Sequence, residues 1–488
     1  NTVMAEDYSP LLVSSSSDSS LERCIGGVGA AGLEHEEHEA TGVVAGWVDL
    51  TDTARRSRGA SLEPLLDEDQ GEEIGLSTRF AQLTLFMSAV GTGLMSLPYS
   101  FMCLGVVNGV ATLLLSGCTV YFTGDLILRS YLASPIDAES FDALTRSSCS
   151  LATGSWWHAR PWLAVALVNG VNAMGLFGGC CAYLAIGKDL LVSLTSQAPE
   201  TWHGKWYANA ENLTLSLVTF VTLPLCMARG ISALRYASVF GFIFSMYMVC
   251  IISFRGLERI AAGKPGWKDV YTGDCPQESL WSSFVAALSV FNFSFVFHFN
   301  VLPLYRSLTN ANRSRKTMQS VIRRTTLSCV FIYAALGICG YALFGNAVDE
   351  NILNNFDRHD QAINLARAAI CSCCFICLPL LQHPLRGTVN TIFNVSNTFL
   401  SRALLVVTLL MIETVIALKA STIRPVLQVT GGSAVVLTCF AFPVLFAFAH
   451  LSGAESGEIK LSQIEKYLCV AVIVCFPVCG FYSVLGAN

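Results

Sequence analysis

The chain has 488 residues, of which 53% are hydrophobic and only 13% are charged, and its mean hydropathy is +0.53. This composition excludes an ordinary water-soluble protein of the same length, because that much apolar surface could not be hidden from water. The net charge of −5 is unevenly divided, with −12 on residues 1–78 and +7 on the remainder, and no basic patch interleaved with aromatic residues indicates nucleic-acid binding.

Residues 1–78 predict a disordered, acidic, Ser-rich cytoplasmic tail. They contain 16 of the 35 acidic residues and a serine run at residues 14–20, so they cannot bury enough apolar surface to offset the entropy lost on ordering. The segment Asp7-Tyr8-Ser9-Pro10-Leu11-Leu12 has the acidic-dileucine pattern that sorting adaptors can bind. Short patterns of this kind also arise by chance.

From residue 79 to residue 486 the sequence predicts a transmembrane domain of eleven helices. Each apolar segment is long enough to cross a hydrocarbon core of about 30 Å. The predicted spans are 79–103, 106–128, 162–187, 211–228, 235–254, 280–304, 325–345, 364–384, 402–419, 426–450 and 465–486. With the N-terminus in the cytoplasm, the inner loops and flanks collect 20 Lys and Arg residues against 10 outside, in agreement with the positive-inside rule.

The first span is predicted to be broken at Gly91-Thr92-Gly93, where two glycines precede Pro98. The sixth span is predicted to be broken as well, because polar residues interrupt its aromatic run at Asn292-Phe293-Ser294 and at His298. Spans one and six occupy equivalent places in two five-helix halves related by an inverted repeat. The sequence therefore predicts an all-α integral membrane fold with interrupted helices 1 and 6.

A helix interrupted inside the membrane indicates a cavity lined by protein or water, because freed backbone groups are intolerable in lipid. Backbone N–H groups after Gly93 could bind a carboxylate, and carbonyls of Asn292 to Ser294 could bind an ammonium group. An α-amino acid is the simplest molecule that satisfies both ends. The alternative is that Gly91 and Gly93 form a small-residue groove for close helix packing.

The segment Gly91-Thr92-Gly93-Leu94-Met95-Ser96-Leu97-Pro98-Tyr99 resembles the first-helix signature of the amino acid/auxin permease family. The segment His298-Phe299-Asn300-Val301-Leu302-Pro303-Leu304-Tyr305 is similar to the sixth-helix pattern of the family's sodium-coupled neutral amino acid transporters. The chain also resembles the family's cationic amino acid transporters. The resemblance covers about residues 79–486. It implies an eleven-helix LeuT-like fold and alternating access around a site between helices 1 and 6.

The resemblance also implies the substrate contacts, which are Val90, Gly91, Thr92, Gly93, Leu94, Asn292, Phe293, Ser294 and Phe297. The resemblance supports sodium coupling less well than it supports the substrate contacts. Sodium-binding members use hydroxyl and carbonyl oxygens of helices 1 and 8, but the stretch before Pro379 offers mainly cysteines, with Ser372 as its hydroxyl. Thiols are poor ligands for a hard cation, so we expect transport that is proton-coupled or uncoupled.

Three residues are candidates for ion or proton coupling, namely Glu413, His298 and Ser372. Glu413 lies in the middle of the ninth span, where a carboxyl group requires an aqueous cavity, a partner or protonation. It could carry a proton or face a cationic substrate, or it could be a neutral, hydrogen-bonded carboxyl between helices. His298 could shuttle protons, or it could be held by a hydrogen bond.

We expect a secondary active transporter of neutral or cationic amino acids. We do not expect an enzyme, because no Ser/His/Asp, Cys/His or HExxH arrangement converges in the sequence. No cofactor or metal is expected. The expected partners are the amino acid, the lipid bilayer, a proton or sodium ion and sorting adaptors at Asp7–Leu12. The membrane could be the plasma membrane or a lysosomal or vacuolar one. Two alternatives stay open, namely an amino-acid sensor that signals through its tail, and a transporter of another solute such as a polyamine.

Overall fold

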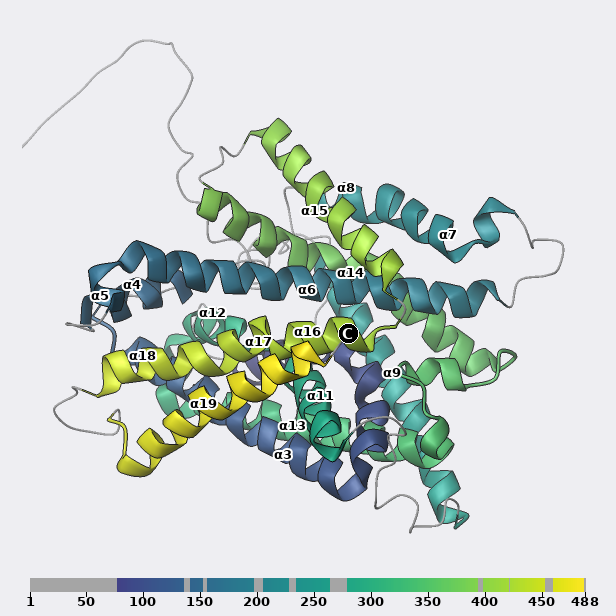
Figure 1. The fold of residues 1–488 in the computed structure, drawn as a ribbon, viewed down its shortest axis with the longest axis horizontal. Coiled ribbons are helices and arrows are strands. Elements are labelled where there is room, and N and C mark those ends of the chain that lie inside the picture. Colours follow the sequence, from purple (N-terminus) through teal and green to yellow (C-terminus); the bar gives the residue numbers. More distant parts are fainter. Residues whose placement is uncertain are drawn as a thin grey trace, which may run out of the picture. The chain divides into compact units, whose positions relative to one another are not determined.

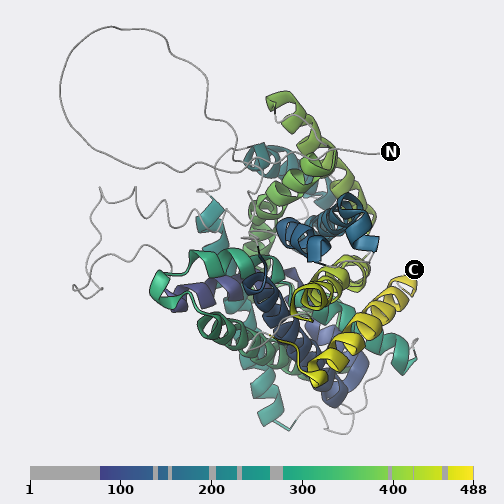
Figure 2. The same ribbon diagram turned by 90° about the vertical axis from the view of Figure 1, so that its left-hand side faces the viewer.

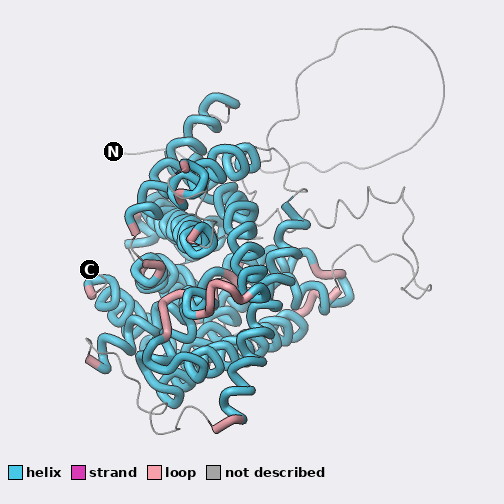
Figure 3. Tube along the Cα trace, turned by 90° about the vertical axis from the view of Figure 1, so that its right-hand side faces the viewer, coloured by secondary structure: helices cyan, strands magenta, loops and turns pink. Residues whose placement is uncertain are grey.

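The computed structural model describes residues 77–135, 141–151, 156–196, 205–227, 234–263, 279–393, 398–420, 422–452 and 460–486. The predicted tail and its dileucine pattern lie outside these ranges, except for the last two residues of the tail. One of these two residues, Ser77, accepts a hydrogen bond from the amide of Phe80 and so caps the first described helix. All of the regular structure within the described ranges is helical (Figure 3).

Helices lie at the predicted spans, and several of them extend seven to ten residues beyond the predicted bounds. Their bounds are α2 Thr78–Ala89, η1 Thr92–Ser96, α3 Leu97–Leu132, α4 Phe141–Leu151, α5 Trp156–Ala159, α6 Pro161–Thr195, α7 Ala210–Leu217, η4 Val218–Thr222, α8 Leu223–Met227, α9 Leu234–Ala261, α11 Leu280–Ser294, η6 His298–Asn300, α12 Val301–Ser307, α13 Arg315–Phe344, η9 Ile352–Asn355, α14 Gln361–Phe393, α15 Phe399–Lys419, α16 Arg424–Gly432, α17 Ala434–Val436, η10 Leu437–Ala441, α18 Phe442–Leu451 and α19 Gln463–Leu485.

Ten helices in the described ranges are long and apolar enough to cross a membrane. One of them runs from Gly93 to Leu132 and contains the C-terminal part of the first predicted span together with the second. Gly105 separates these two parts with a φ of 76°, a left-handed conformation that favours glycine and turns the chain. The count of ten does not confirm eleven spans, but the all-helical membrane fold is confirmed.

Long helices from distant parts of the sequence pack side by side in the core. Helix α6 packs along α14, while α3 packs against both α13 and α11 (Figures 1 and 2). Helix α11 also contacts α16, where Gly431 lies so close to α11 that an added Cβ would overlap with the backbone of Ser289. Small residues thus bring α11 and α16 close together, as is common in membrane bundles.

Both predicted interruptions are present, and they divide the first and the sixth spans. Helix α2 ends at Ala89 and the chain resumes as η1 at Thr92. Helix α11 ends at Ser294, and η6 begins at His298. Asn292-Phe293-Ser294 therefore forms the last turn of α11, and the non-helical residues are 295–297, slightly later than the sequence predicts. This is the pair of broken helices expected for a LeuT-like arrangement.

Candidate substrate site

The first break consists of Val90 and Gly91. Both residues are extended, with φ and ψ of −75° and 97° at Val90 and of −137° and −150° at Gly91. The amide of Val90 still donates to the carbonyl of Phe86, and the amide of Leu94 donates to the carbonyl of Gly91 at 3.3 Å. Helix η1 then leads into α3, which starts at Leu97 with Pro98 in its first turn, a position where proline costs no hydrogen bond.

The second break follows α11. The amide of Phe295 donates to the carbonyls of Phe291 and Asn292 at 3.2 and 3.3 Å, which closes the last turn of the helix. Phe297 then leaves the helical conformation with φ −132° and ψ 1°. The carbonyl of Ser294 therefore lies at the end of a half-helix, where it has no amide partner of its own helix.

The two breaks touch each other at Gly93 and Ser294. A Cβ added at Gly93 would overlap with the Ser294 hydroxyl, and it would lie 3.1 Å from the Cβ and 3.3 Å from the Cα of Ser294. The Ser294 hydroxyl is held in place by a 2.9 Å hydrogen bond to the carbonyl of Val290. Glycine at position 93 is thus required by a close approach of the two interrupted helices.

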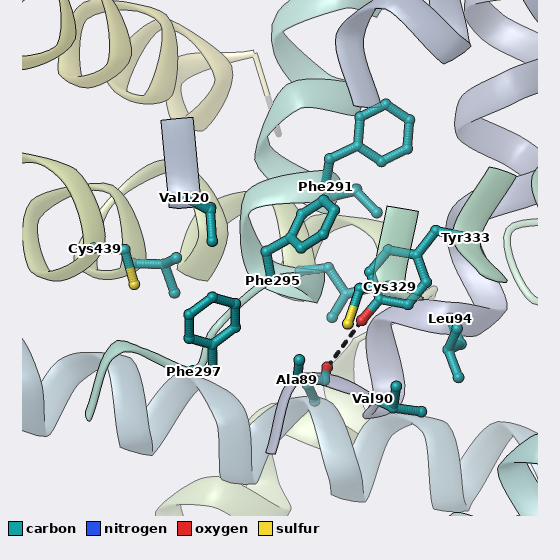
Figure 4. Packing of buried hydrophobic residues seen from close by; sticks show 14 of the residues in the cluster. Ala89, Val90, Leu94, Val120, Phe291, Phe295, Phe297, Cys329, Tyr333 and Cys439 are labelled. Atoms are coloured by element: carbon teal, nitrogen blue, oxygen red, sulfur yellow. Dashed lines mark hydrogen bonds between the residues drawn. The ribbon is translucent and has the colours of Figure 1, made fainter. Parts of the chain in front are cut away.

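Tyr333 of α13 joins the two breaks. Its hydroxyl lies 3.1 Å from the carbonyl of Ala89, the last residue of α2 (Figure 4). The same hydroxyl lies 2.6 Å from the carbonyl of Ser294, the last residue of α11. The side chain is fully buried, and its ring packs against that of Phe295 at 5.0 Å between centroids. Because a phenol carries one hydrogen, it can donate fully to only one of these carbonyls at a time.

The predicted substrate residues surround this meeting point, although not all of them face it with a free polar group. Val90 and Leu94 are buried apolar side chains beside the first break. Asn292 is buried and accepts a hydrogen bond at 3.2 Å from Ser116 of α3. Phe297 is fully buried and stacks on His298, with 5.2 Å between ring centroids.

Of the other predicted contacts, Phe293 lies against Gly431 of α16, and Thr92 begins η1. Gly91, Gly93 and Ser294 form the two breaks themselves. The structure therefore brings these residues into one region, while their contact with a substrate stays a prediction.

Sequence reasoning missed Tyr183 of α6. A Cβ added at Gly91 would lie 3.8 Å from its hydroxyl, so the phenol group borders the first break. Tyr183 belongs to α6, which packs along α14, the helix that carries Cys373, Cys374 and Cys377. The phenol therefore borders the first break from a helix that packs against the cysteine-rich segment of the eighth predicted span. A tyrosine inside an apolar run gives no signal of this position in the sequence.

The three candidate coupling residues lie in different environments. Glu413 of α15 is fully buried, and neither of its carboxyl oxygens has a hydrogen-bond partner within the described part of the chain. The Cys180 thiol and the Gln382 side chain lie beside it, and the thiol donates at 3.3 Å to the Gln382 side-chain carbonyl. A buried carboxyl group requires polar neighbours or protonation, because it is costly when ionised without them.

His298 and Ser372 are placed differently. His298 is fully buried, and its Nε2 lies 2.9 Å from the Thr123 hydroxyl of α3. Ser372 is on an exposed face of α14, and its hydroxyl donates at 2.8 Å to the carbonyl of Ala368. The structure does not bring Ser372 to the breaks, and a coupling role for either residue stays a prediction.

The helical membrane fold and the two interrupted spans that meet at one point define the class of multi-pass membrane transporters. Residues 75–487 match the family described as "Transmembrane amino acid transporter protein". The chain therefore belongs to this family, the amino acid/auxin permeases, whose members are transporters and not enzymes.

Individual relatives cover most of the chain at low identity. "Sodium-coupled neutral amino acid transporter 7" of Mus musculus is 25% identical over 446 residues, which cover 86% of this chain and 89% of the relative. "Amino acid transporter AVT6C" of Arabidopsis thaliana is 25% identical over 449 residues, covering 88% and 98%. Among solved structures, MhsT in complex with L-phenylalanine matches with a TM-score of 0.49 at 15% identity, covering 86% of this chain and all of that one.

Proposed function

We propose that this chain carries amino acids across a membrane by alternating access, with the substrate bound between the broken spans one and six. The observation that supports this proposal most directly is the Tyr333 hydroxyl, which lies within hydrogen-bonding distance of the carbonyl ends of both α2 and α11. Since its single hydrogen serves one carbonyl at a time, a shift of this bond from one break to the other is a means for the two half-helices to move relative to each other.

An α-amino acid fits the polar groups around the breaks. Its carboxylate would accept hydrogen bonds from backbone amides after Gly91 and from the Tyr183 hydroxyl, which borders that glycine. Its ammonium group would lie near the last carbonyls of α11, of which that of Ser294 is within reach of Tyr333. These groups are neutral dipoles, so a zwitterion is stabilised at both ends without a charged side chain in the site.

The coupling ion is proposed from the thiols of α14. Cys373 and Cys377 place their sulfurs 3.6 and 3.7 Å from the position of a Cβ on Gly241 of α9. Although several relatives are named sodium-coupled, sulfur is a poor ligand for sodium. We infer proton-coupled or uncoupled transport, with the buried Glu413 as the group that would carry the proton.

The sequence supports one orientation of the chain in the membrane and a cellular location. The excess of Lys and Arg in alternate loops supports a cytoplasmic N-terminus. The Asp7–Leu12 pattern favours sorting by adaptors toward a lysosomal or vacuolar membrane, and the plasma membrane is the other candidate. Replacing Leu11 and Leu12 by alanine in a fluorescently tagged full chain tests this address. Retention of an internal location after that change would count against a role of the motif.

Uptake of labelled amino acids into proteoliposomes tests the transport proposal. We expect a neutral amino acid to accumulate when the proton concentration is higher outside, or to exchange without any gradient, and an imposed sodium gradient to add little. Tyr183→Phe removes only the hydroxyl beside Gly91 and should raise KM about tenfold, the effect of losing a hydrogen bond to a charged group. Unchanged KM in this variant would contradict the proposed carboxylate contact.

A second candidate function is that of an amino-acid sensor, which the charge of −12 on residues 1–78 favours because such a tail can bind a cytoplasmic partner. Removing residues 1–76 separates the two functions. A carrier keeps its flux after the deletion, whereas a sensor loses partner binding. If only a polyamine or another solute is taken up, the substrate class proposed above is wrong.

A further inference from the structure

Helix α13 carries a row of cationic side chains on one face near its start. Lys316, Arg323 and Arg324 are all exposed, and the helical spacings of seven and eight residues place them on the same side of the helix. Within the described part of the chain, none of the three forms an ion pair. Three uncompensated positive charges therefore lie within about 12 Å along this helix.

The carboxylates around the start of α13 do not neutralise these charges. Helix α13 itself contains no Asp or Glu. Asp125 of α3 reaches the start of α13, but it pairs with Arg315 at 3.5 Å and with Arg129 of its own helix at 3.8 Å. Arg129 is also paired with Glu465 of α19. These two carboxylates are thus engaged with other arginines, and the cationic face is left to a partner that the described residues do not supply.

The same face of α13 becomes apolar one turn further along the helix. Leu327 and Phe331 follow Arg323 by four and eight residues, and they are 62% and 75% exposed. Because α13 is long and apolar enough to cross a membrane, these exposed side chains face acyl chains. The cations before them therefore lie at the level where acyl chains give way to headgroups.

From this order of charge and apolar surface we propose that the face of α13 from Lys316 to Phe331 binds an anionic phospholipid. The phosphate accepts hydrogen bonds from the two guanidinium groups and the lysine ammonium group, and an acyl chain lies along Leu327 and Phe331. With the N-terminus in the cytoplasm, the start of α13 meets the cytoplasmic leaflet, whose anionic lipids attract basic segments of this kind. The same helix carries Tyr333, so the bound lipid stabilises the helix that joins the two breaks.

The acidic stretch at residues 63–73 is the other candidate occupant of this face. It contains six carboxyl groups and no basic residue, and it ends four residues before Ser77, where the described chain begins. A peptide that also covered Leu327 and Phe331 would bring backbone groups without hydrogen-bond partners into the acyl region, which is costly. A phospholipid has no such groups and matches both the charged and the apolar part of the face.

Thermal unfolding of the purified chain in detergent tests the proposal. At saturation, dioleoylphosphatidic acid should raise the melting temperature about 2–4 °C more than dioleoylphosphatidylcholine, which has the same acyl chains but a zwitterionic headgroup. Glycerol 3-phosphate carries the phosphate without acyl chains and should have less than half of this effect, which separates a lipid from a free phosphate. Raising the salt concentration tenfold should remove most of the lipid effect. Equal stabilisation by both lipids at low salt would overturn the proposal.

Neutralising the cationic face should abolish the difference between the two lipids. The variant replaces all three cations of the face, as Lys316→Gln/Arg323→Gln/Arg324→Gln. If this triple variant does not fold, Arg324→Gln alone serves, and it should lower the difference by about a third, because each cation contributes separately to the attraction. An unchanged difference in the folded variant would contradict the assignment of the site to this face.

The matched control removes the same number and type of charges from other parts of the chain. It replaces one lysine and two arginines that are exposed and lie outside α13, as Lys205→Gln/Arg259→Gln/Arg358→Gln. This variant should keep the full response to phosphatidic acid. An equal loss in both triple variants would show that net charge, and not the face of α13, determines the response.

Carbodiimide crosslinking tests the acidic stretch as the occupant, because it joins the Lys316 amine to a carboxyl group in direct contact. In vesicles that contain phosphatidic acid, no crosslink between Lys316 and residues 63–73 should form. A crosslink to this stretch would overturn the lipid as the occupant and assign the face to the acidic segment.

Discussion

The contact between the two breaks predicts that Gly93→Ala slows transport by more than tenfold. The added methyl group would overlap with the Ser294 hydroxyl and would lie 3.1 Å from its Cβ and 3.3 Å from its Cα. The hydroxyl cannot swing away freely, because it donates to the Val290 carbonyl at 2.9 Å. Either this bond breaks or α11 moves away from η1.

Two energetic costs, overpacking and a lost hydrogen bond, set the size of the effect. Overpacking a dense interior costs about 1–3 kcal/mol, and a lost buried hydrogen bond costs about 1 kcal/mol. A penalty of about 2 kcal/mol on the state in which Gly93 meets Ser294 lowers its population about thirtyfold. We therefore expect the initial uptake rate of Gly93→Ala to fall by more than tenfold, at unchanged amounts of reconstituted protein.

The matched control is Gly170→Ala in α6. Gly170 is also a helical glycine, but an added Cβ would meet nothing within 4 Å, so this variant should transport normally. The double variant Gly93→Ala/Ser294→Gly removes the obstructing side chain and leaves only the backbone of residue 294 close to the new methyl group. It should recover part of the uptake, compared with Ser294→Gly alone. Wild-type uptake by Gly93→Ala would refute the close approach of the two breaks.

Three further changes test the other groups. Tyr333→Phe keeps the ring and loses the hydrogen bond to the two breaks, so uptake should fall several-fold while the melting temperature falls by only a few degrees. Glu413→Gln keeps the size of the buried side chain and removes the group that would carry the proton, so it should flatten the dependence of uptake on the proton gradient; an unaltered dependence would exclude Glu413 as the carrier. Arg255, which donates two hydrogen bonds to Asp360 outside the spans, lowers the pKa of that carboxyl below its usual range. The stabilisation of the fold by the Arg255–Asp360 pair is present at pH 5 and above and disappears as the pH falls below about 4. Arg255→Gln should therefore lower the melting temperature equally at pH 7 and pH 5, and a difference measured between them would contradict this pairing.

The spans and the breaks were accessible from the sequence because their signals are local. Apolar runs of about 20 residues mark the helices, and glycines followed by Pro98 mark the first break. The second break was placed slightly too early, since the polar residues Asn292 and Ser294 still belong to the last turn of α11. Asn292 is polar because it pairs with Ser116 of α3, a partner 176 residues away.

Side chains that act across helices could not be predicted in this way. Tyr333 and Tyr183 stand in apolar runs of spans seven and three, where a tyrosine has no sequence neighbour that indicates its partner. Only the packing of α13 and α6 against the breaks brings their hydroxyls there. Arg424 likewise resembles an arginine at a helix end, and its contact with the Tyr99 ring gives no signal in the sequence.

Uptake into proteoliposomes under imposed gradients tests the central claim most directly. The purified chain is reconstituted, and uptake of labelled neutral amino acids is compared with an inward proton gradient, with an inward sodium gradient, and with neither. Gly93→Ala is the control with strongly reduced uptake. We predict saturable uptake that the proton gradient increases or leaves unchanged and that sodium does not increase. If no amino acid accumulates or exchanges under any of these conditions, the account of this chain as an amino acid transporter is contradicted.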